Sequence, residues 1–150
     1  LFEAGIDLDV RAGCPNLIER IEAGLLSYGN DMTLENTPYE CGLGKFCNPE
    51  LAPSCVGANA LILESINGPD KLIRYFDIQG SKLPNCITPW PIMKNNNIVG
   101  QITSAAYSPD FKTNVAIGMI ERESWDDKTE VVININEKKH DAFVKTKSFI

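Results

Sequence analysis

The chain is organised around the stretch RIEAGLLSYGNDM, residues 20–32, which reads as the end of a helix that runs into a tight turn. Leu17, Ile21 and Leu25 recur at a spacing of four residues and form one apolar stripe, which predicts an amphipathic helix. Gly29 is expected to end this helix, because glycine adopts the left-handed conformation at no steric cost. The stretch therefore predicts a chain reversal with defined side-chain positions around it.

Four side chains of this stretch are candidate binding residues, namely Arg20, Glu22, Tyr28 and Asp31. Arg20 and Glu22 fall at opposite edges of the apolar stripe, and Tyr28 and Asp31 lie at the expected turn. Each also has an ordinary interpretation: the charged pair as solvated helix residues, the tyrosine as a half-buried core aromatic, and the aspartate as a turn residue. Spacing alone leaves both interpretations open.

Three further blocks follow residues 20–32 along the chain. They are NTPYECGL at residues 36–43, IVGQITS at residues 98–104, and SP at residues 108–109 followed by NVAIG at residues 114–118. Together the blocks resemble motifs that occur in the same order in the folate-dependent aminomethyltransferase family, the T-protein of the glycine cleavage system. The resemblance covers most of the chain.

Other segments favour one branch of this family. RAGCPNLIER at residues 11–20, ECGLGKFC at residues 40–47 and LPNC at residues 83–86 are similar to the dimethylsulfoniopropionate demethylases. The aminomethyltransferases usually carry Ser-Trp where this chain has Gly44-Lys45. That departure argues against a plain aminomethyltransferase.

The resemblance implies a tetrahydrofolate-dependent methyltransferase that converts dimethylsulfoniopropionate to methylmercaptopropionate and gives 5-methyltetrahydrofolate. A sulfonium methyl is strongly electrophilic because the departing thioether is neutral, so the protein has to hold donor and acceptor in line and exclude water. A small-molecule methyl donor is then the expected partner and tetrahydrofolate the expected cofactor. The catalytic residue of the family is expected upstream of this sequence, which would be the C-terminal part of a longer chain.

The resemblance also gives the candidate residues roles. Arg20 is the expected folate contact, because a planar guanidinium pairs well with polar ring edges or a carboxylate. Tyr28 is expected to stack on, or hydrogen-bond to, the pterin–benzoyl region of the cofactor. Glu22 is expected to orient Arg20 rather than act as a base. Asp31 and Asn30 are expected to support the site.

Three other functions remain open at this point. The first is aminomethyl transfer in the glycine cleavage system, which would require the lipoyl carrier protein as a partner. The second is a non-catalytic folate-binding module of a sarcosine or dimethylglycine oxidase. The third is a structural β-barrel, as in translation factors, without affinity for folate.

The composition of the chain argues against several classes of function. With 14 Lys and Arg against 20 Asp and Glu the chain carries a net charge of −6, so affinity for nucleic acid is not expected. No apolar run approaches the ~20 residues of a membrane helix. The five cysteines form no C-x-x-C pair and His140 is the single histidine, so neither a disulfide framework nor a metal site is expected. We expect a cytoplasmic protein with reduced thiols, and a homodimer is left open.

The predicted fold class is α+β, with the end of a folate-binding α/β part at residues 1–68 and a small antiparallel β-barrel at residues 69–150. The boundary is expected near residues 67–70, where Asn-Gly-Pro at residues 67–69 ends a helix predicted over residues 49–66. The short strands after this boundary fit a barrel or a sandwich, and the resemblance favours the barrel.

Local patterns predict the individual elements. Residues 1–5 read as the end of a helix capped by Gly5, and residues 6–10 read as a short half-buried strand because apolar and acidic residues alternate. Pro15 suits the first position of the helix that follows. Beyond the domain boundary, strands are expected over residues 72–78, 90–93, 98–106, 114–120, 129–136 and 142–147.

Overall fold

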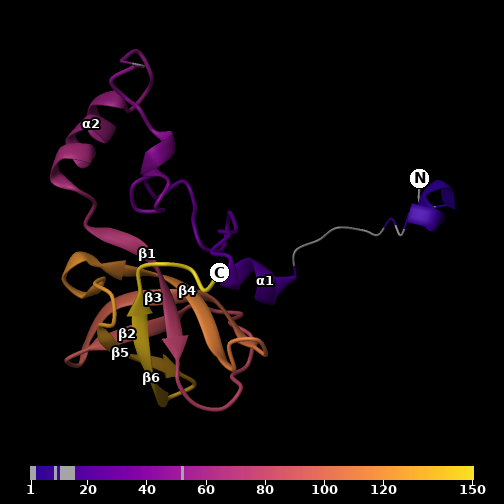
Figure 1. Ribbon diagram of the computed structural model, residues 1–150. Coiled ribbons are helices and arrows are strands. Elements are labelled where there is room, and N and C mark those ends of the chain that lie inside the picture. Colours follow the sequence, from indigo (N-terminus) through magenta and orange to yellow (C-terminus); the bar gives the residue numbers. More distant parts are fainter. Residues whose placement is uncertain (1–2, 9, 11–15, 52) are drawn as a thin grey trace.

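The computed structural model describes residues 3–8, 10, 16–51 and 53–150. The described chain forms a closed six-stranded barrel and a mostly irregular segment with short helices at one end of it (Figure 1). The observed chain is thus of the α+β class and ends in a small antiparallel barrel, as predicted.

Each strand of the barrel is antiparallel to its neighbours. The strands are β1 Lys71–Ile78, β2 Trp90–Lys94, β3 Asn97–Ser108, β4 Thr113–Glu121, β5 Glu130–Ile135 and β6 Lys138–Lys145. Their order is β1-β4-β3-β2-β5-β6, and β6 pairs with β1 to close the sheet. Closure satisfies the backbone groups that an open sheet would leave at its edges. The sandwich that strand spacing also allowed is not the observed fold.

Two-residue turns connect β2 to β3 and β5 to β6. Asn95 and Asn96 in the first turn have φ values of 51° and 65°, and Asn136 and Glu137 in the second have 49° and 66°. Two successive left-handed residues match the twist of the flanking strands, so these turns hold tight hairpins. The second turn starts β6 at Lys138, earlier than predicted, because a glutamate does not mark a left-handed position in the sequence.

Alternate side chains of the strands fill the barrel interior. On β5, Val131, Ile133 and Ile135 point inward and are buried, whereas Val132 and Asn134 are partly exposed. The large side chains of this core that are fully buried are Phe76, Ile78, Ile92, Ile102, Ile120, Ile133 and Val144. Burial of each such side chain contributes about 1.5–3 kcal/mol, so this core stabilises the barrel.

A second apolar cluster lies outside the barrel, where helix α1, Leu17–Glu22, packs against β3 and β4. Ile21 is fully buried in this cluster, which also contains the buried residues Ile73, Val115 and Met119. The helix begins with a capping box between its N-cap residue and the third helical residue. The apolar stripe of the sequence therefore acts mainly through Ile21, which anchors the N-terminal segment to the barrel.

Helix α1 is shorter than predicted. Gly24, with φ of +71°, ends it, and the N–H groups of Gly24 and Leu25 bond back to carbonyls of the last turn in a Schellman motif. A Cβ atom at Gly24 would lie 2.5 Å from the hydroxyl oxygen of Tyr75. The end predicted at Gly29 was wrong, and Leu25, 52% exposed, does not belong to a buried stripe.

The strand predicted over residues 6–10 was also wrong. Glu3–Leu8 forms a 3₁₀ helix, η1, and Gly5 lies inside it rather than after a helix. A lone strand would leave its backbone groups without partners, whereas a 3₁₀ helix satisfies them locally. Pro15 lies outside the described residues, and Asn16 caps the helix that follows.

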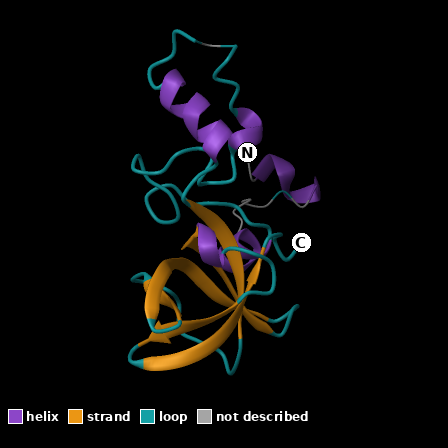
Figure 2. Cartoon of the chain, turned by 90° about the vertical axis from the view of Figure 1, so that its left-hand side faces the viewer, coloured by secondary structure: helices purple, strands orange, loops and turns teal. Residues whose placement is uncertain are grey.

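The second helix, α2 Ala58–Asn67, begins later than the predicted residue 49, since Gly57 is left-handed with φ of +85°. It ends at Asn67 with Gly68 as its C-cap, within the Asn-Gly-Pro stretch predicted to end it. Arg122 donates hydrogen bonds to carbonyl oxygens at this end and so ties the helix to the barrel. Figure 2 shows α2 standing away from the strands. The shorter 3₁₀ helices are η2 Gly44–Phe46 and η3 Arg122–Ser124.

Candidate functional site

A buried hydrogen-bond network centred on Asp31 joins the N-terminal segment to β3. Its Oδ2 atom accepts from Arg20 Nη1 at 2.6 Å and from the backbone N–H of Ser27 at 2.8 Å. Its Oδ1 atom accepts from Thr103 Oγ1 and from Ser104 Oγ, both at 2.6 Å. The Asp31 side chain is 0% exposed. A buried carboxylate with four strong donors is well compensated for the loss of water.

Arg20 reaches this network from the last turn of α1. Its Nη1 also donates to the Leu25 carbonyl oxygen at 2.9 Å, and its Nη2 donates to Ser104 Oγ at 2.7 Å. These bonds with the Asp31 contact use three of the five N–H donors of a guanidinium. The Arg20 side chain is 16% exposed, so it is largely but not completely buried.

A β-bulge places both hydroxyls of β3 on the same carboxylate. The register of β3 against β4 shifts between Ile102 and Ser104, at Thr103. In a regular strand successive side chains point to opposite faces, whereas a bulge re-aims one of them. Thr103 and Ser104 thereby both reach Asp31. The sequence did not predict their role, although the TS pair ends the block at residues 98–104, because a bulge has no clear sequence signal.

Tyr28 lies on the turn that the network holds. Asp31 N–H donates to the Ser27 carbonyl oxygen at 2.8 Å, and Gly29 N–H donates to the Met32 carbonyl oxygen at 2.8 Å. Tyr28 and Met32 form an isolated β-bridge within this turn. The Tyr28 side chain is 65% exposed, so it is presented at the surface from a fixed backbone.

In the described part of the chain, Glu22 and Arg20 have different hydrogen-bond partners. It is 5% exposed, and among the described residues its Oε1 atom has no hydrogen-bond partner. Its carbonyl oxygen accepts from the backbone N–H groups of Phe149 and Ile150 at 2.9 and 3.1 Å. The carboxylate that orients Arg20 is that of Asp31, so the orienting role we expected for Glu22 falls to Asp31.

A small polar pocket of about 180 Å³ adjoins the network. Its lining consists of Asn30, Asp31, Met32, Thr33, Glu35, Asn36, Lys71, Gln101, Thr103 and Met119. Complete ligand pockets usually measure about 300–1,000 Å³, so this one has the size of a single wall or subsite.

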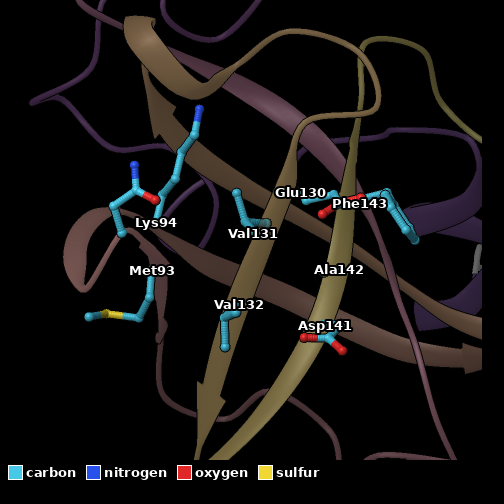
Figure 3. Close-up of a pocket in the computed structure, with 9 residues that line it drawn as sticks. Met93, Lys94, Glu130, Val131, Val132, Asp141, Ala142 and Phe143 are labelled. Atoms are coloured by element: carbon cyan, nitrogen blue, oxygen red, sulfur yellow. The ribbon is translucent and has the colours of Figure 1, made fainter.

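A larger pocket of about 410 Å³ lies elsewhere, along β2, β5 and β6 (Figure 3). Apolar Met93, Val132 and Phe143 and acidic Glu130 and Asp141 contribute to its lining. None of the four candidate residues lines this pocket. The candidate site is therefore the Asp31 network with the turn that carries Tyr28.

The described residues contain no group of three His, Cys, Asp or Glu side chains that could hold a metal ion. Cys41, Cys47, Cys55 and Cys86 are free thiols. Burial, with a smaller contribution from the charge of Asp31, raises the pKa of Cys86 to about 11. In the part of the chain that the structure describes, no helix is long and apolar enough to cross a membrane.

Residues 76–150 match the family described as the glycine cleavage T-protein C-terminal barrel domain. The chain belongs to this T-protein barrel family. The match covers five of the six strands completely and begins within β1, so it corresponds to the closed barrel of the structure.

Dimethylsulfoniopropionate demethylase and aminomethyltransferase both occur among the relatives of this chain. The chain is 58% identical over 126 residues to dimethylsulfoniopropionate demethylase DmdA of Ruegeria pomeroyi. The aligned region covers 83% of this chain and 34% of that protein. The chain is 32% identical over 130 residues to an aminomethyltransferase of Prochlorococcus marinus, with 87% and 34% covered.

A solved structure agrees with the family assignment. The aminomethyltransferase T of the glycine cleavage system from Bartonella henselae matches with a TM-score of 0.76 and 26% identity. The match covers 87% of this chain and 37% of that one. The chain thus spans about a third of the length of the curated relatives it matches.

Proposed function

We propose that the complete protein containing this chain is a tetrahydrofolate-dependent methyltransferase that demethylates dimethylsulfoniopropionate. The products would be methylmercaptopropionate and 5-methyltetrahydrofolate. The observation that carries the proposal is the identity of 58% to DmdA, against 32% to an aminomethyltransferase over a similar length. The Gly44-Lys45 pair, where aminomethyltransferases usually carry Ser-Trp, supports the same choice.

The proposed reaction needs no covalent nucleophile from the protein. Tetrahydrofolate would supply the N5 amine that accepts the methyl group, while sulfur keeps the electron pair of the broken C–S bond and the N5 proton leaves. The protein has to bind the cofactor in a fixed orientation and keep competing water out. This chain would contribute one wall of that site.

The described residues fit such a wall. Tyr28 offers an exposed aromatic ring on which a pterin or benzoyl group could stack. Among the described residues Arg20 uses three of its five N–H donors, and its partner Asp31 lines the small polar pocket. Glu22 has a buried oxygen that lacks a partner among the described residues, and Asp31 holds the turn. We propose these four as the cofactor-binding residues of the chain.

Aminomethyl transfer in the glycine cleavage system is the second candidate. Its support is the fold match to the Bartonella henselae aminomethyltransferase and the relatives from Prochlorococcus marinus. It would replace the sulfonium donor by an aminomethyl group on a carrier protein. The two candidates share the folate site and differ in the donor.

We also propose two domains, with residues 1–68 as the end of the folate-binding part and residues 69–150 as the barrel. The start of β1 at Lys71 and the family match from residue 76 support this division. The free thiols support a cytoplasmic location. Exposed apolar residues such as Phe46 and Val56 leave surface for a second copy or for the rest of the protein.

The full-length protein, incubated with tetrahydrofolate and dimethylsulfoniopropionate, tests the proposal directly. We expect 5-methyltetrahydrofolate to form in step with methylmercaptopropionate. A parallel reaction with an aminomethylated lipoyl carrier protein should give no 5,10-methylenetetrahydrofolate. Turnover in the second reaction without turnover in the first would replace the proposal by the aminomethyltransferase.

A further inference from the structure

We propose that Thr103 and Ser104 of the barrel are positioning residues for the cofactor, acting through Asp31 on the turn that presents Tyr28. The inference rests on the proposed function, because the ligand that Tyr28 would meet is tetrahydrofolate. The barrel would then take part in cofactor binding indirectly. The two hydroxyls on the β3 bulge contact Asp31, and Asp31 holds the turn that carries Tyr28.

The β3 bulge brings two hydroxyl groups to one carboxylate. Thr103 is 5% exposed and Ser104 is 2% exposed, so both hydroxyls are buried. A buried hydroxyl without a partner is costly, and an unkinked strand would aim only one of the two at Asp31. The register shift between Ile102 and Ser104 brings both to Oδ1 at 2.6 Å. The local distortion of the strand therefore serves this carboxylate.

The Ser104 hydroxyl connects β3 to three residues of the N-terminal segment. A serine hydroxyl has one donor and two acceptor positions. Ser104 Oγ donates to Asp31 Oδ1 and accepts from Arg20 Nη2 and from Asn30 Nδ2, both at 2.7 Å. All three positions are used, and Asn30 also donates to the Thr103 carbonyl oxygen at 2.9 Å. Two residues of the turn, Asn30 and Asp31, are thus held by the same two residues of β3.

Asp31 connects these hydroxyls to the backbone next to Tyr28. Oxygen Oδ1 of Asp31 faces the barrel hydroxyls, and Oδ2 accepts the backbone N–H of Ser27, which directly precedes Tyr28. The Asp31 N–H in turn donates to the Ser27 carbonyl oxygen. The backbone directly before Tyr28 is therefore held by a carboxylate whose own position depends on β3. An exposed ring gains binding strength when its backbone is ordered before the ligand arrives.

The test compares variants of the full-length protein by calorimetric titration with tetrahydrofolate. We expect the double variant Thr103→Val/Ser104→Ala to raise the Kd by about tenfold, the scale of one hydrogen bond to a charged group. We also expect faster hydrogen exchange at the amide of Ser27. Thr103→Ser keeps the hydroxyl and should bind like the wild type.

A double-mutant cycle separates positioning from general stability. If Thr103 and Ser104 act through Tyr28, the double variant should weaken binding little further in a Tyr28→Ala background. Fully additive losses of affinity would overturn the inference. Thr113→Val is the matched control, because it removes another Thr–Asp bond of the barrel, from Thr113 Oγ1 to Asp77 Oδ1 at 2.5 Å, and should leave the Kd unchanged.

The outcomes also separate this inference from the proposed function. If the wild type binds tetrahydrofolate and the double variant binds equally well, the positioning role is wrong while the function stands. If the wild type does not bind tetrahydrofolate, the proposed function fails and the positioning role fails with it.

Discussion

Arg20 Nη1 lies 2.6 Å from Asp31 Oδ2, and this largely buried ion pair connects the end of α1 to the turn that carries Tyr28. Both partners also bond to Ser104 of β3. A charge pair that is removed from water and shared between three segments holds their relative positions, since breaking it leaves an uncompensated buried charge.

Arg20→Ala should therefore lower the free energy of unfolding of the full-length protein by about 3 kcal/mol, because Asp31 would lose its charged partner. Urea unfolding monitored by circular dichroism measures the change. Lys71→Ala is the comparison: its pair with Glu40 is 3.7 Å long and Lys71 is 42% exposed, so the loss should stay below about 1 kcal/mol. Equal losses in the two variants would mean that the Arg20 pair is not special.

Tyr28 should matter for binding and not for stability. Its side chain is 65% exposed, so Tyr28→Ala should change the free energy of unfolding by no more than about 0.5 kcal/mol. The same variant should raise the KM for tetrahydrofolate in the methyl-transfer assay, and Tyr28→Phe should retain more activity if stacking outweighs the hydroxyl. Equal losses for the two variants would remove stacking as the explanation.

Gly24 should be the more sensitive of two left-handed glycines. Gly24 and Gly42 have φ values of 71° and 70°, so the backbone strain of an alanine is the same at both. A Cβ at Gly24 would lie 2.5 Å from the Tyr75 hydroxyl, whereas nothing lies within 4 Å of one at Gly42. We expect Gly42→Ala to cost about 1 kcal/mol and Gly24→Ala to cost about 1–3 kcal/mol more, measured by thermal unfolding.

The pKa of Cys86 predicts a loss of stability in alkaline solution. Burial raises it from an ordinary value of 9.0 to about 11, so the folded state disfavours the thiolate. A pKa that is higher in the folded state gives a contribution that is complete below pH 9 and is lost as the pH rises through about 11. Cys86→Ala should flatten the pH dependence of the unfolding free energy in this window.

The reactivity of the thiols gives an independent check. Cys55 is exposed and Cys86 is partly buried, with its Sγ 3.3 Å from the Thr88 carbonyl oxygen. At pH 8 a thiol reagent should modify Cys55 well before Cys86. A Cys86 that reacts as fast as Cys55 would contradict the raised pKa.

Local patterns were sufficient for elements whose periodicity and turn residues agree. The alternation of Val131, Ile133 and Ile135 predicted β5, and Asn67 with Gly68 predicted the end of α2. They were insufficient where a contact distant in sequence decides the conformation. Gly24 ends α1 in a left-handed conformation that the sequence offered equally at Gly29, and only the fold shows that the Tyr75 ring lies where a Cβ at Gly24 would be.

The sequence by itself determined the family resemblance, the alternating apolar strands of the barrel and the polar residues of the turn, because these depend on residue type and short-range spacing. The tertiary structure alone decided that Asp31, and not Glu22, is the partner of Arg20, and that Thr103 and Ser104 share its carboxylate. The contacts of Thr103 and Ser104 with Asp31 join residues more than 70 positions apart through a strand bulge. Long-range pairing follows from how the barrel closes and packs, which no local pattern encodes.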